Sequence, residues 1–498
     1  MMPADPLSPI PARDFDHWAA AHLLRRAGFG GSPEDVGLLQ AAGLDDAVDR
    51  LVDYEPWPDD DGRFTADIMR PLTPDERSTL ARAREIGDEA VIERYRRDRQ
   101  ERQRRDRRQL AGIRRWWLER MIRTPSPLEE KLTLFWHGHY ATGYRKIEDS
   151  WHLLMQNRLF RRFAAGDARK LSAGIVRDPA MLRYLDAQQN VRGRPNENLA
   201  RELLELFVLG EGAGYGERDV KEVARALTGL SIEDDRVVFL EDRHDPGVKT
   251  ILGRRGRFGA DDVLLVLFGR PQASRFLAEK LYRFFVNDAP GPRDREADRT
   301  VDGLARLLRR HDFELAPVLA RLFRSRHFHD PRNRAAIVKS PVQLVVEAVR
   351  SLDLSVGDLD RVLVDLDRMG QSLLEPPSVK GWDGGRAWIN TATLFVRQNV
   401  SVGLMVGEGP GATPFPAERL VAHFGRDRGF EGVDAAPDAD AVVDYLLHFC
   451  LGRPPTEARR RELRRFVDEL GPDSTTLDRD RLVAILALIT ALPEYQLC

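Results

Sequence analysis

Apolar residues recur at helical spacing along most of this chain, and few segments alternate with the period of a strand. Residues 17–24 show the helical spacing first, and Ser32 followed by Pro33 is typical of the start of the next helix. The same spacing is found at 127–137, 150–164, 196–209, 217–228, 272–286, 299–352 and 358–373. One extended piece, 236–240, could form a hairpin with residues near 249–252. We therefore expect an all-α or mostly α fold of many helices, with long loops and at most a small β-hairpin.

The chain has 498 residues, which is too long for one small hydrophobic core. A Pro- and Asp-rich loop at 54–73 precedes a long polar segment, and a Gly/Pro-rich linker lies at 407–416. We divide the chain accordingly into an N-terminal helical segment at 1–73, a long charged helix at 74–126, a central helical core at 127–406 and a C-terminal helical unit at 407–498. The central core carries most of the unusual polar residues.

The overall charge gives no attraction to nucleic acid or to an anionic membrane, because the formal net charge is only −2. One local exception is the segment 94–108, which holds nine arginines against Asp98, Glu101 and Asp106. Arginines three or four residues from acidic side chains are typical of a solvated helix face with ion pairs. We therefore expect an exposed helix here and no binding of nucleic acid.

The two cysteines, Cys450 and Cys498, are too few for a disulfide framework and fit a reducing compartment. The first twelve residues lack the basic and apolar regions of a secretory signal. No run of about 18 apolar residues could span a membrane. We expect a cytoplasmic protein.

His137-Gly138-His139 could contribute two ligands to a metal, provided that the backbone bends at Gly138. A third ligand would come from His244 or from one of the nearby carboxylates. Imidazole and carboxylate ligands suit a divalent ion in a site with an open position. The alternative is that one histidine binds a backbone carbonyl while the other packs beside Trp136.

Glu202 and Glu205 share one helix face, since they lie three residues apart. Paired carboxylates can bind a cation or act as acid and base. Asp219 and Arg225 lie along one side of the next predicted helix, so we take these four residues as catalytic candidates. In the alternative interpretation Arg201, four residues from Glu205, forms only a ladder of ion pairs.

The segment 376–390 combines prolines, glycines and two tryptophans, which predicts an irregular loop able to hold a phosphate, a sugar or a base. It lacks the nucleotide-binding glycine patterns, and it could equally plug the core with its tryptophans. The residues expected to bind substrate are Asn196, Asn198, Arg201, Lys380, Trp382 and Arg386.

Lysine is rare in this sequence, with only eight among the 77 basic residues. A guanidinium and an ammonium differ in shape and hydration, so the lysines that persist in an arginine-rich chain could be positions where arginine does not serve. Six of the eight lie in or beside the motifs above, at positions 131, 221, 249, 280, 339 and 380. This distribution favours one shared polar site.

Seven segments, taken in order, resemble the bacterial domain of unknown function 1800 family. They are the opening motif at 22–30, the surroundings of His137 and His139, the segments 196–210 and 219–229, His244-Asp245, Lys339-Ser340-Pro341 and the loop 376–389. The resemblance covers residues 17 to 498. Just before the segment 219–229, the family often has a hydroxyl residue where Gly216 stands.

The family has no established activity, and its members are often encoded beside a protein of the domain of unknown function 1501 family, which resembles sulfatases. From the polar motifs we expect an enzyme of the hydrolase type with a metal-assisted site. The alternative is a non-catalytic helical scaffold, or a partner-binding protein that acts with the sulfatase-like neighbour. Side chains that converge on one pocket would favour the enzyme. Side chains paired off beside a large exposed apolar patch would favour the scaffold.

Overall fold

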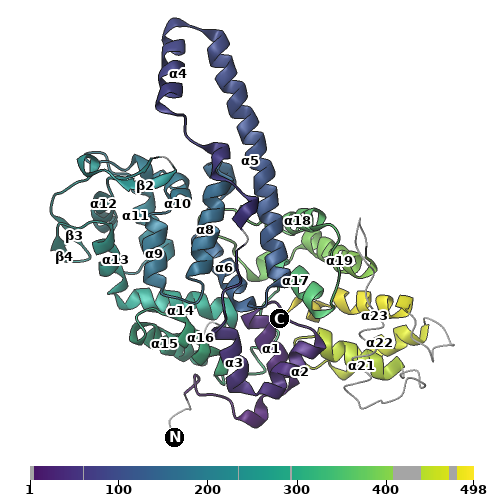
Figure 1. The fold of residues 1–498 in the computed structure, drawn as a ribbon. Helices are drawn as coiled ribbons and strands as arrows, with labels where there is room; N and C mark the ends of the chain where they lie inside the picture. The colour runs from purple at the N-terminus through teal and green to yellow at the C-terminus, as the bar shows by residue number, and fades with distance from the viewer. Residues whose placement is uncertain (1–4, 60, 234, 292–293, 408–438, 470–478) are drawn as a thin grey trace.

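A computed structural model describes residues 5–59, 61–233, 235–291, 294–407, 439–469 and 479–498. Within these ranges the protein is mostly α-helical and has two small antiparallel sheets of two strands each (Figure 1). The expected fold class is confirmed. The described helices include none that is long and apolar enough to cross a membrane.

The N-terminal helices are α1 (His17–Ala27), α2 (Pro33–Ala42) and α3 (Leu44–Val52). The Asp16 side chain caps α1 by accepting a hydrogen bond from the Ala19 amide. At the start of α2, Ser32 and Asp35 form a reciprocal capping box around Pro33, as expected from the sequence. The apolar faces of these helices pack into the first of two hydrophobic clusters.

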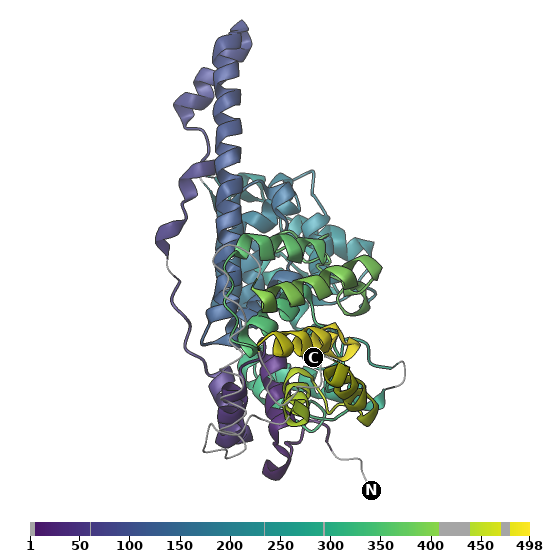
Figure 2. The same ribbon diagram turned by 90° about the vertical axis from the view of Figure 1, so that its right-hand side faces the viewer.

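The polar segment predicted as one helix over 75–123 consists of two helices, α4 (Pro74–Ile86) and α5 (Glu89–Arg123). Gly87 ends α4 in the left-handed conformation (φ 71°), and Asp88 then caps α5. Figures 1 and 2 show that α4 and the adjoining half of α5 project from the body as an arm. Most arginines of 94–108 are exposed on this arm, as expected.

The centre of the molecule is a set of helices around α6 (Pro127–His139), which is buried almost throughout. The other members are α7 (Tyr144–Ile147), α8 (Ser150–Arg162), α9 (Ala168–Val176), α10 (Pro179–Tyr184), α13 (Ala260–Phe268), α14 (Pro271–Phe285), α15 (Arg295–Arg310) and α16 (Leu315–Arg324). Together with α1 to α3 they enclose the first hydrophobic cluster. In Figure 1, α6 and α8 stand in the middle of the body, behind α5.

The predicted helix over 196–209 changes type along its length. Helix α11 (Asn198–Glu202) continues into a π-helical segment (Leu203–Val208), and Gly210 follows with φ 95°. Helix α12 (Glu217–Ala226) comes next. Each of these segments buries an apolar face in the first cluster.

The expected pairing of residues 236–240 with residues near 249–252 is wrong. Strand β2 (Arg236–Phe239) pairs with β1 (Leu230–Glu233), while β3 (Lys249–Ile251) pairs with β4 (Arg254–Gly256). Two local hairpins therefore replace the single one. Leu252 and Gly253 both have positive φ, which is the backbone of the tight turn that joins adjacent strands.

The second hydrophobic cluster combines the end of α5 with the helices that follow the central set. These are α17 (Pro341–Ser351), α18 (Leu359–Arg368), α19 (Thr391–Val406), α21 (Ala439–Cys450), α22 (Glu457–Glu469) and α23 (Arg479–Ala491). They lie on the opposite side of the body from α9, α12 and α13 (Figure 1). Most of the predicted linker 407–416 lies outside the described residues.

Candidate functional site

A cavity of about 280 Å³ lies where α6, α14, the start of α17 and the loop 376–388 meet. Arg26 of α1 and Cys498 also reach it, so its walls come from distant parts of the sequence. Three of the predicted site residues, His139, Lys380 and Trp382, line this cavity. A larger hollow between α18 and α19 has paired charges, such as Arg368 with Asp365 at 3.2 Å, and holds none of the predicted site residues.

The lining of the cavity is strongly cationic. Six basic side chains contribute to it against two acidic ones, Asp288 and Asp383, and the six are Arg26, Lys131, Lys280, Arg283, Lys339 and Lys380. Lys339 forms an ion pair with Glu347 (2.9 Å) and Lys380 forms one with Glu211 (3.0 Å). The other four basic residues form no ion pair within the described part of the chain.

Positive charge extends from the mouth of the cavity to its interior. Arg283 and Lys380 are exposed, whereas Arg26, Lys131 and Lys339 are buried. Burial lowers the pKa of Lys131 to about 8, and burial also lowers the pKa of Lys339 despite its partner Glu347. Buried positive charge of this kind is costly unless an anion joins it.

The loop 376–388 closes one wall, and its backbone depends on glycine. Gly381, Gly384 and Gly385 all have positive φ. A side chain on Gly381 would collide with the carbonyl oxygen of Gly138 on α6, so the loop backbone touches the helix directly. The Trp382 ring then packs over Gly138. The close approach therefore depends on Gly381, whereas a Cβ on Gly138 would meet only the Trp382 ring at an ordinary contact distance of 3.7 Å. Gly138 also does not bend the helix as the metal hypothesis required.

The predicted metal ligands His137 and His139 are not brought together by the fold. Helix α6 is continuous through both residues, and side chains at i and i+2 of a helix diverge by roughly 200°. His139 Nε2 donates a hydrogen bond to the carbonyl oxygen of Phe207 (2.9 Å). The His137 ring packs between Trp117 and Trp382. Burial lowers the pKa of both imidazoles to about 3, so both are neutral.

His244, the third proposed ligand, donates from Nδ1 to the carbonyl oxygen of Thr228 (2.9 Å) and stays in its own turn. In the described ranges, a different group has the spacing of metal ligands: Asp149, His152 and Asp235. Arg183 already lies beside both carboxylates, 3.3 Å from Asp149 and 3.6 Å from Asp235. The guanidinium supplies the positive charge there, so this group is an ion-pair cluster.

Glu202 and Glu205 lie near the cavity mouth without lining it. Burial and the neighbouring charge of Glu205 raise the pKa of Glu202, while Lys380 opposes the rise. Arg201 pairs with Glu205 (3.3 Å) and Glu217 (2.9 Å), as the ion-pair alternative expected. Lys380 therefore connects the loop electrostatically with these carboxylates.

Asn196 and Asn198 shape the backbone before α11. The Asn196 side chain accepts a hydrogen bond from the Asn198 amide (2.9 Å), and the Asn198 side chain donates to the carbonyl oxygen of Leu185 (3.3 Å). Arg386 is exposed in the loop and does not line the cavity.

Asp219 and Arg225 hold α12 against the second hairpin. Asp219 accepts hydrogen bonds from the amides of Gly216 (3.0 Å) and Leu252 (2.7 Å). Arg225 binds Asp245 (2.7 Å) and Glu222 (2.8 Å). Their hydrogen-bonding capacity is thus used within the fold, away from the cavity.

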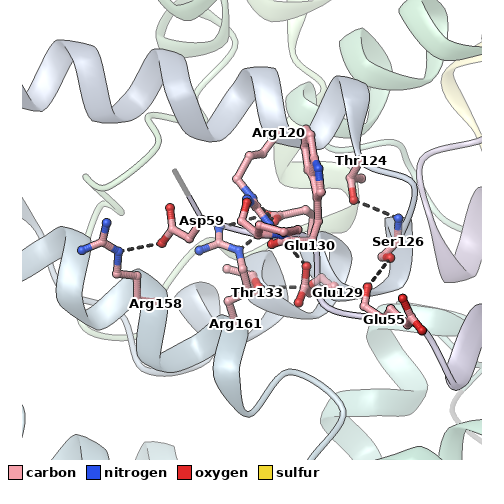
Figure 3. Close-up of polar contacts among 12 residues, drawn as sticks. Glu55, Asp59, Arg120, Thr124, Ser126, Glu129, Glu130, Thr133, Arg158 and Arg161 are labelled. Atoms are coloured by element: carbon pink, nitrogen blue, oxygen red, sulfur yellow. Dashed lines mark hydrogen bonds and ion pairs between the residues drawn. The ribbon is translucent and has the colours of Figure 1, made fainter. Parts of the chain in front are cut away.

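A buried network that the sequence did not predict lies behind α6 (Figure 3). Glu130 accepts hydrogen bonds from Arg120 (2.8 Å), Arg161 (2.7 and 3.0 Å) and Trp117 (3.0 Å). Burial alone would raise the pKa of Glu130, but the two guanidinium groups outweigh it and lower that pKa. The network joins α5, α6 and α8, and it fixes the helix from which Lys131 reaches the cavity.

Sequence reasoning singled out Lys131, Lys280 and Lys339 as rare lysines but did not place them in the site. All three line the cavity together with Lys380, so half of the lysines of the chain meet at one place. Their rarity was the signal that could have identified them.

The comparisons with known proteins give a family and no activity. The sequence profile of a family described as "Protein of unknown function (DUF1800)" matches residues 22–497. No curated protein and no solved structure matches the chain. The chemistry of the cavity therefore has to be argued from its own residues.

Proposed function

Because the chain belongs to the DUF1800 family, which is described only as being of unknown function, we propose its role from the cavity. We propose that the protein is an enzyme that binds a small organic anion between α6, α14 and the loop 376–388. The observation that carries this proposal is the convergence of four of the eight lysines and two arginines on one cavity of about 280 Å³. Clefts lined by one sign of charge concentrate ligands of the opposite sign.

The lining also indicates what kind of molecule carries the anionic group of the ligand. Trp382, Trp388 and Phe284 contribute aromatic surface beside the cationic groups. Such a mixture suits a phosphate, sulfate or carboxylate attached to a small apolar or planar body. The volume restricts the ligand to a small molecule.

Hydrolysis is the reaction type that we propose, in line with the expectation from the sequence. Among the lining residues, His139 is a neutral imidazole, and Asp288 is a carboxyl group whose pKa is raised by burial. Groups of this kind serve as acid and base when a substrate brings water between them. No step of this proposal uses a metal at His137, His139 or His244.

Titration of the full chain with inorganic phosphate and with pyridoxine 5′-phosphate tests the binding proposal. Quenching of Trp382 and Trp388, which line the cavity, reports occupancy. We expect saturable binding that weakens with added salt. Lys280→Gln or Lys380→Gln should weaken it at least about tenfold, since a hydrogen bond to a charged group contributes about 1.5–3 kcal/mol and about 1.4 kcal/mol corresponds to a factor of ten.

The matched control is Lys170→Gln, because the Lys170 side chain is 71% exposed and does not line the cavity. This variant should bind like the unaltered protein. Equal affinities for all three variants would show that the anion binds elsewhere. Absence of binding at any salt concentration would reject the cavity as an anion site.

Partner binding is a second candidate function, and the arm of α4 and α5 favours it. The arm projects from the body and presents exposed arginines (Figure 2). We propose the sulfatase-like neighbour of the domain of unknown function 1501 family as the partner. Co-expression followed by size-exclusion chromatography tests this, and independent elution of the two proteins would contradict it.

The cytoplasm is the compartment that we propose for this chain. Both cysteines are free and buried, which fits a reducing environment. Fractionation of cells that produce the full chain tests the proposal, and recovery from the extracytoplasmic fraction would overturn it.

A further inference from the structure

Lys131 has an environment that differs from that of every other basic residue of the cavity. Its side chain leaves α6 and is only 7% exposed. The ammonium nitrogen lies 5.0 Å from the ring centre of Phe29 and 5.6 Å from that of Phe284. Its hydrogen-bond partner is the side-chain oxygen of Gln343, which is neutral. The amine is thus buried between aromatic walls at the edge of a cavity.

Glu347, a buried carboxylate whose charge acts on Lys131, is already paired with other cations. Glu347 pairs with Arg25 (3.0 Å) and with Lys339 (2.9 Å). Its second oxygen accepts a hydrogen bond from Gln343 (2.8 Å), the residue that binds Lys131 through its other amide atom. Gln343 therefore positions the amine next to Glu347 without giving it a counter-charge.

An isolated buried ammonium is unstable, because it loses hydration and gains no opposite charge. The amine can respond by losing its proton. Burial is the main cause that lowers the pKa of Lys131 to about 8, while Glu347 and Cys498 oppose the shift and Arg26 adds to it. A lysine desolvated in this way beside other cations is activated as a nucleophile at neutral pH.

We propose that Lys131 is a nucleophilic amine that forms an imine with an aldehyde or ketone group of the anionic ligand. This inference rests on the proposed function, because the cationic lining must first hold the anion. It adds a carbonyl group to the description of the ligand. The cavity would then take aldehydes and ketones that also carry a phosphate or carboxylate.

The chemistry requires no group that the cavity lacks. The neutral amine attacks the carbonyl carbon while one N–H continues to donate to Gln343. The amine nitrogen gives up both of its protons to the carbonyl oxygen, which leaves as water, and a C=N bond to Lys131 remains. Arg26 and Lys339 also line the cavity and would hold the anionic group of the ligand during this step. The aromatic walls limit the access of water that would reverse it.

Pyridoxal 5′-phosphate is a suitable probe, because it combines an aldehyde with a phosphate on a planar ring. The full chain is incubated with it at pH 7.5, reduced with borohydride, digested and mapped by mass spectrometry. We expect one adduct per chain at Lys131, formed at least about tenfold faster than at the exposed Lys170, because burial lowers the pKa of Lys131 to about 8 and leaves part of its amine neutral at pH 7.5. Lys131→Met should lose the adduct, and Lys131→Arg should lose it while keeping the positive charge.

Pyridoxine 5′-phosphate, which has an alcohol in place of the aldehyde, separates this inference from the proposed function. It should protect Lys131 from labelling and should still bind to Lys131→Arg. Binding of pyridoxine 5′-phosphate without labelling of Lys131 would overturn the imine and leave anion binding intact. Failure of both phosphates to bind would overturn both proposals. Labelling spread evenly over the exposed lysines would also contradict a special role for Lys131.

Discussion

Replacing Glu130 tests whether the buried network that joins α5, α6 and α8 stabilises the folded protein. In the native structure the Glu130 carboxylate accepts hydrogen bonds from the guanidinium groups of Arg120 and Arg161 (Figure 3). It also accepts one from the Trp117 indole, and the Glu130 side chain is fully buried. Glu130→Gln keeps the shape of the side chain and removes the charge. The NH2 group of glutamine, which is a donor, would then face N–H donors at a place where a carboxylate oxygen had accepted their hydrogen bonds.

The loss of stability in Glu130→Gln depends on which hydrogen bonds Arg120 and Arg161 keep. Arg120 still donates to the backbone carbonyls of Trp57 (2.8 Å) and Pro58 (2.9 Å), and it lies 3.5 Å from Glu129. Within the described part of the chain, Arg161 keeps its hydrogen bond to the side-chain oxygen of Asn157 (2.9 Å) and its contact with the Trp116 ring (5.0 Å). Leaving a buried charge without its partner costs about 3–5 kcal/mol, and we expect Glu130→Gln to lose that much.

The matched control is Glu93→Gln on the arm, where the pair with Arg96 is exposed to solvent. Its loss should stay below about 1 kcal/mol, as for other surface ion pairs. Urea unfolding is followed by circular dichroism and by tryptophan fluorescence, and free energies are compared where the two transitions coincide. Equal losses in the two variants would refute the reasoning.

A double variant tests the cause of the loss. Glu130→Gln combined with Arg161→Met removes the stranded cation together with its partner. It should therefore be more stable than Glu130→Gln alone. If adding Arg161→Met lowers stability further, the uncompensated charge is not the cause.

Four further predictions concern other residues. Burial raises the pKa of Glu129 to about 7, so between pH 4.5 and 7 the folded state binds a proton that the unfolded state has lost. The free energy of unfolding should therefore fall as pH rises from about 4.5 to 7. Glu129→Gln should remove this fall in urea titrations at a series of pH values. His139→Ala leaves the Phe207 carbonyl without its donor and should lose about 1–3 kcal/mol with no change in metal content, whereas loss of a stoichiometric metal in elemental analysis would restore the metal hypothesis. Gly381→Ala should lower the free energy of unfolding by at least about 1–2 kcal/mol, because alanine disfavours the left-handed conformation, and it should weaken phosphate binding. The control is Gly37→Ala at an exposed helical position, which should raise the free energy of unfolding by up to about 1 kcal/mol in thermal unfolding. Changing Arg97, Arg104 and Arg105 to Gln should leave binding to duplex DNA unaltered, and a salt-dependent loss in a gel-shift assay would show that the arm binds nucleic acid.

The helices were predictable because their signals are local. The Ser32-Pro33 start of α2 is confirmed by the backbone. The boundaries and pairings of elements were predicted wrongly where a single turn residue interrupted a longer periodic pattern. The helical periodicity of 75–123 concealed the break at Gly87, and the pairing of 236–240 depended on two tight turns whose positive φ values the sequence does not reveal.

The site was harder to predict, because its residues share neither a helix face nor a sequence pattern. The His137-Gly138-His139 motif was noticeable, yet the backbone carbonyl of its Gly138 lies against Gly381, which is more than two hundred residues away. Paired charges such as Arg225 with Asp245 have the same residue types as a catalytic site, and only their mutual distances show that they satisfy each other. Spacing along the chain therefore could not separate structural pairs from functional ones.

Lysine usage provided the one compositional signal that pointed to the cavity. An arginine can replace a lysine wherever only a surface charge is needed, but the guanidinium is larger and keeps its proton. Lys131 occupies a gap between two aromatic rings with a single neutral acceptor, and a planar fork with five donors would leave most of them unsatisfied there. We therefore infer a chemical requirement for lysine at this position. If Lys131→Arg nevertheless folded normally and still gave a borohydride-stable adduct with pyridoxal 5′-phosphate in the cavity, the requirement would lie with another amine. Lys280 and Lys339 would then be the residues to examine, because they are the remaining buried or half-buried lysines of the lining.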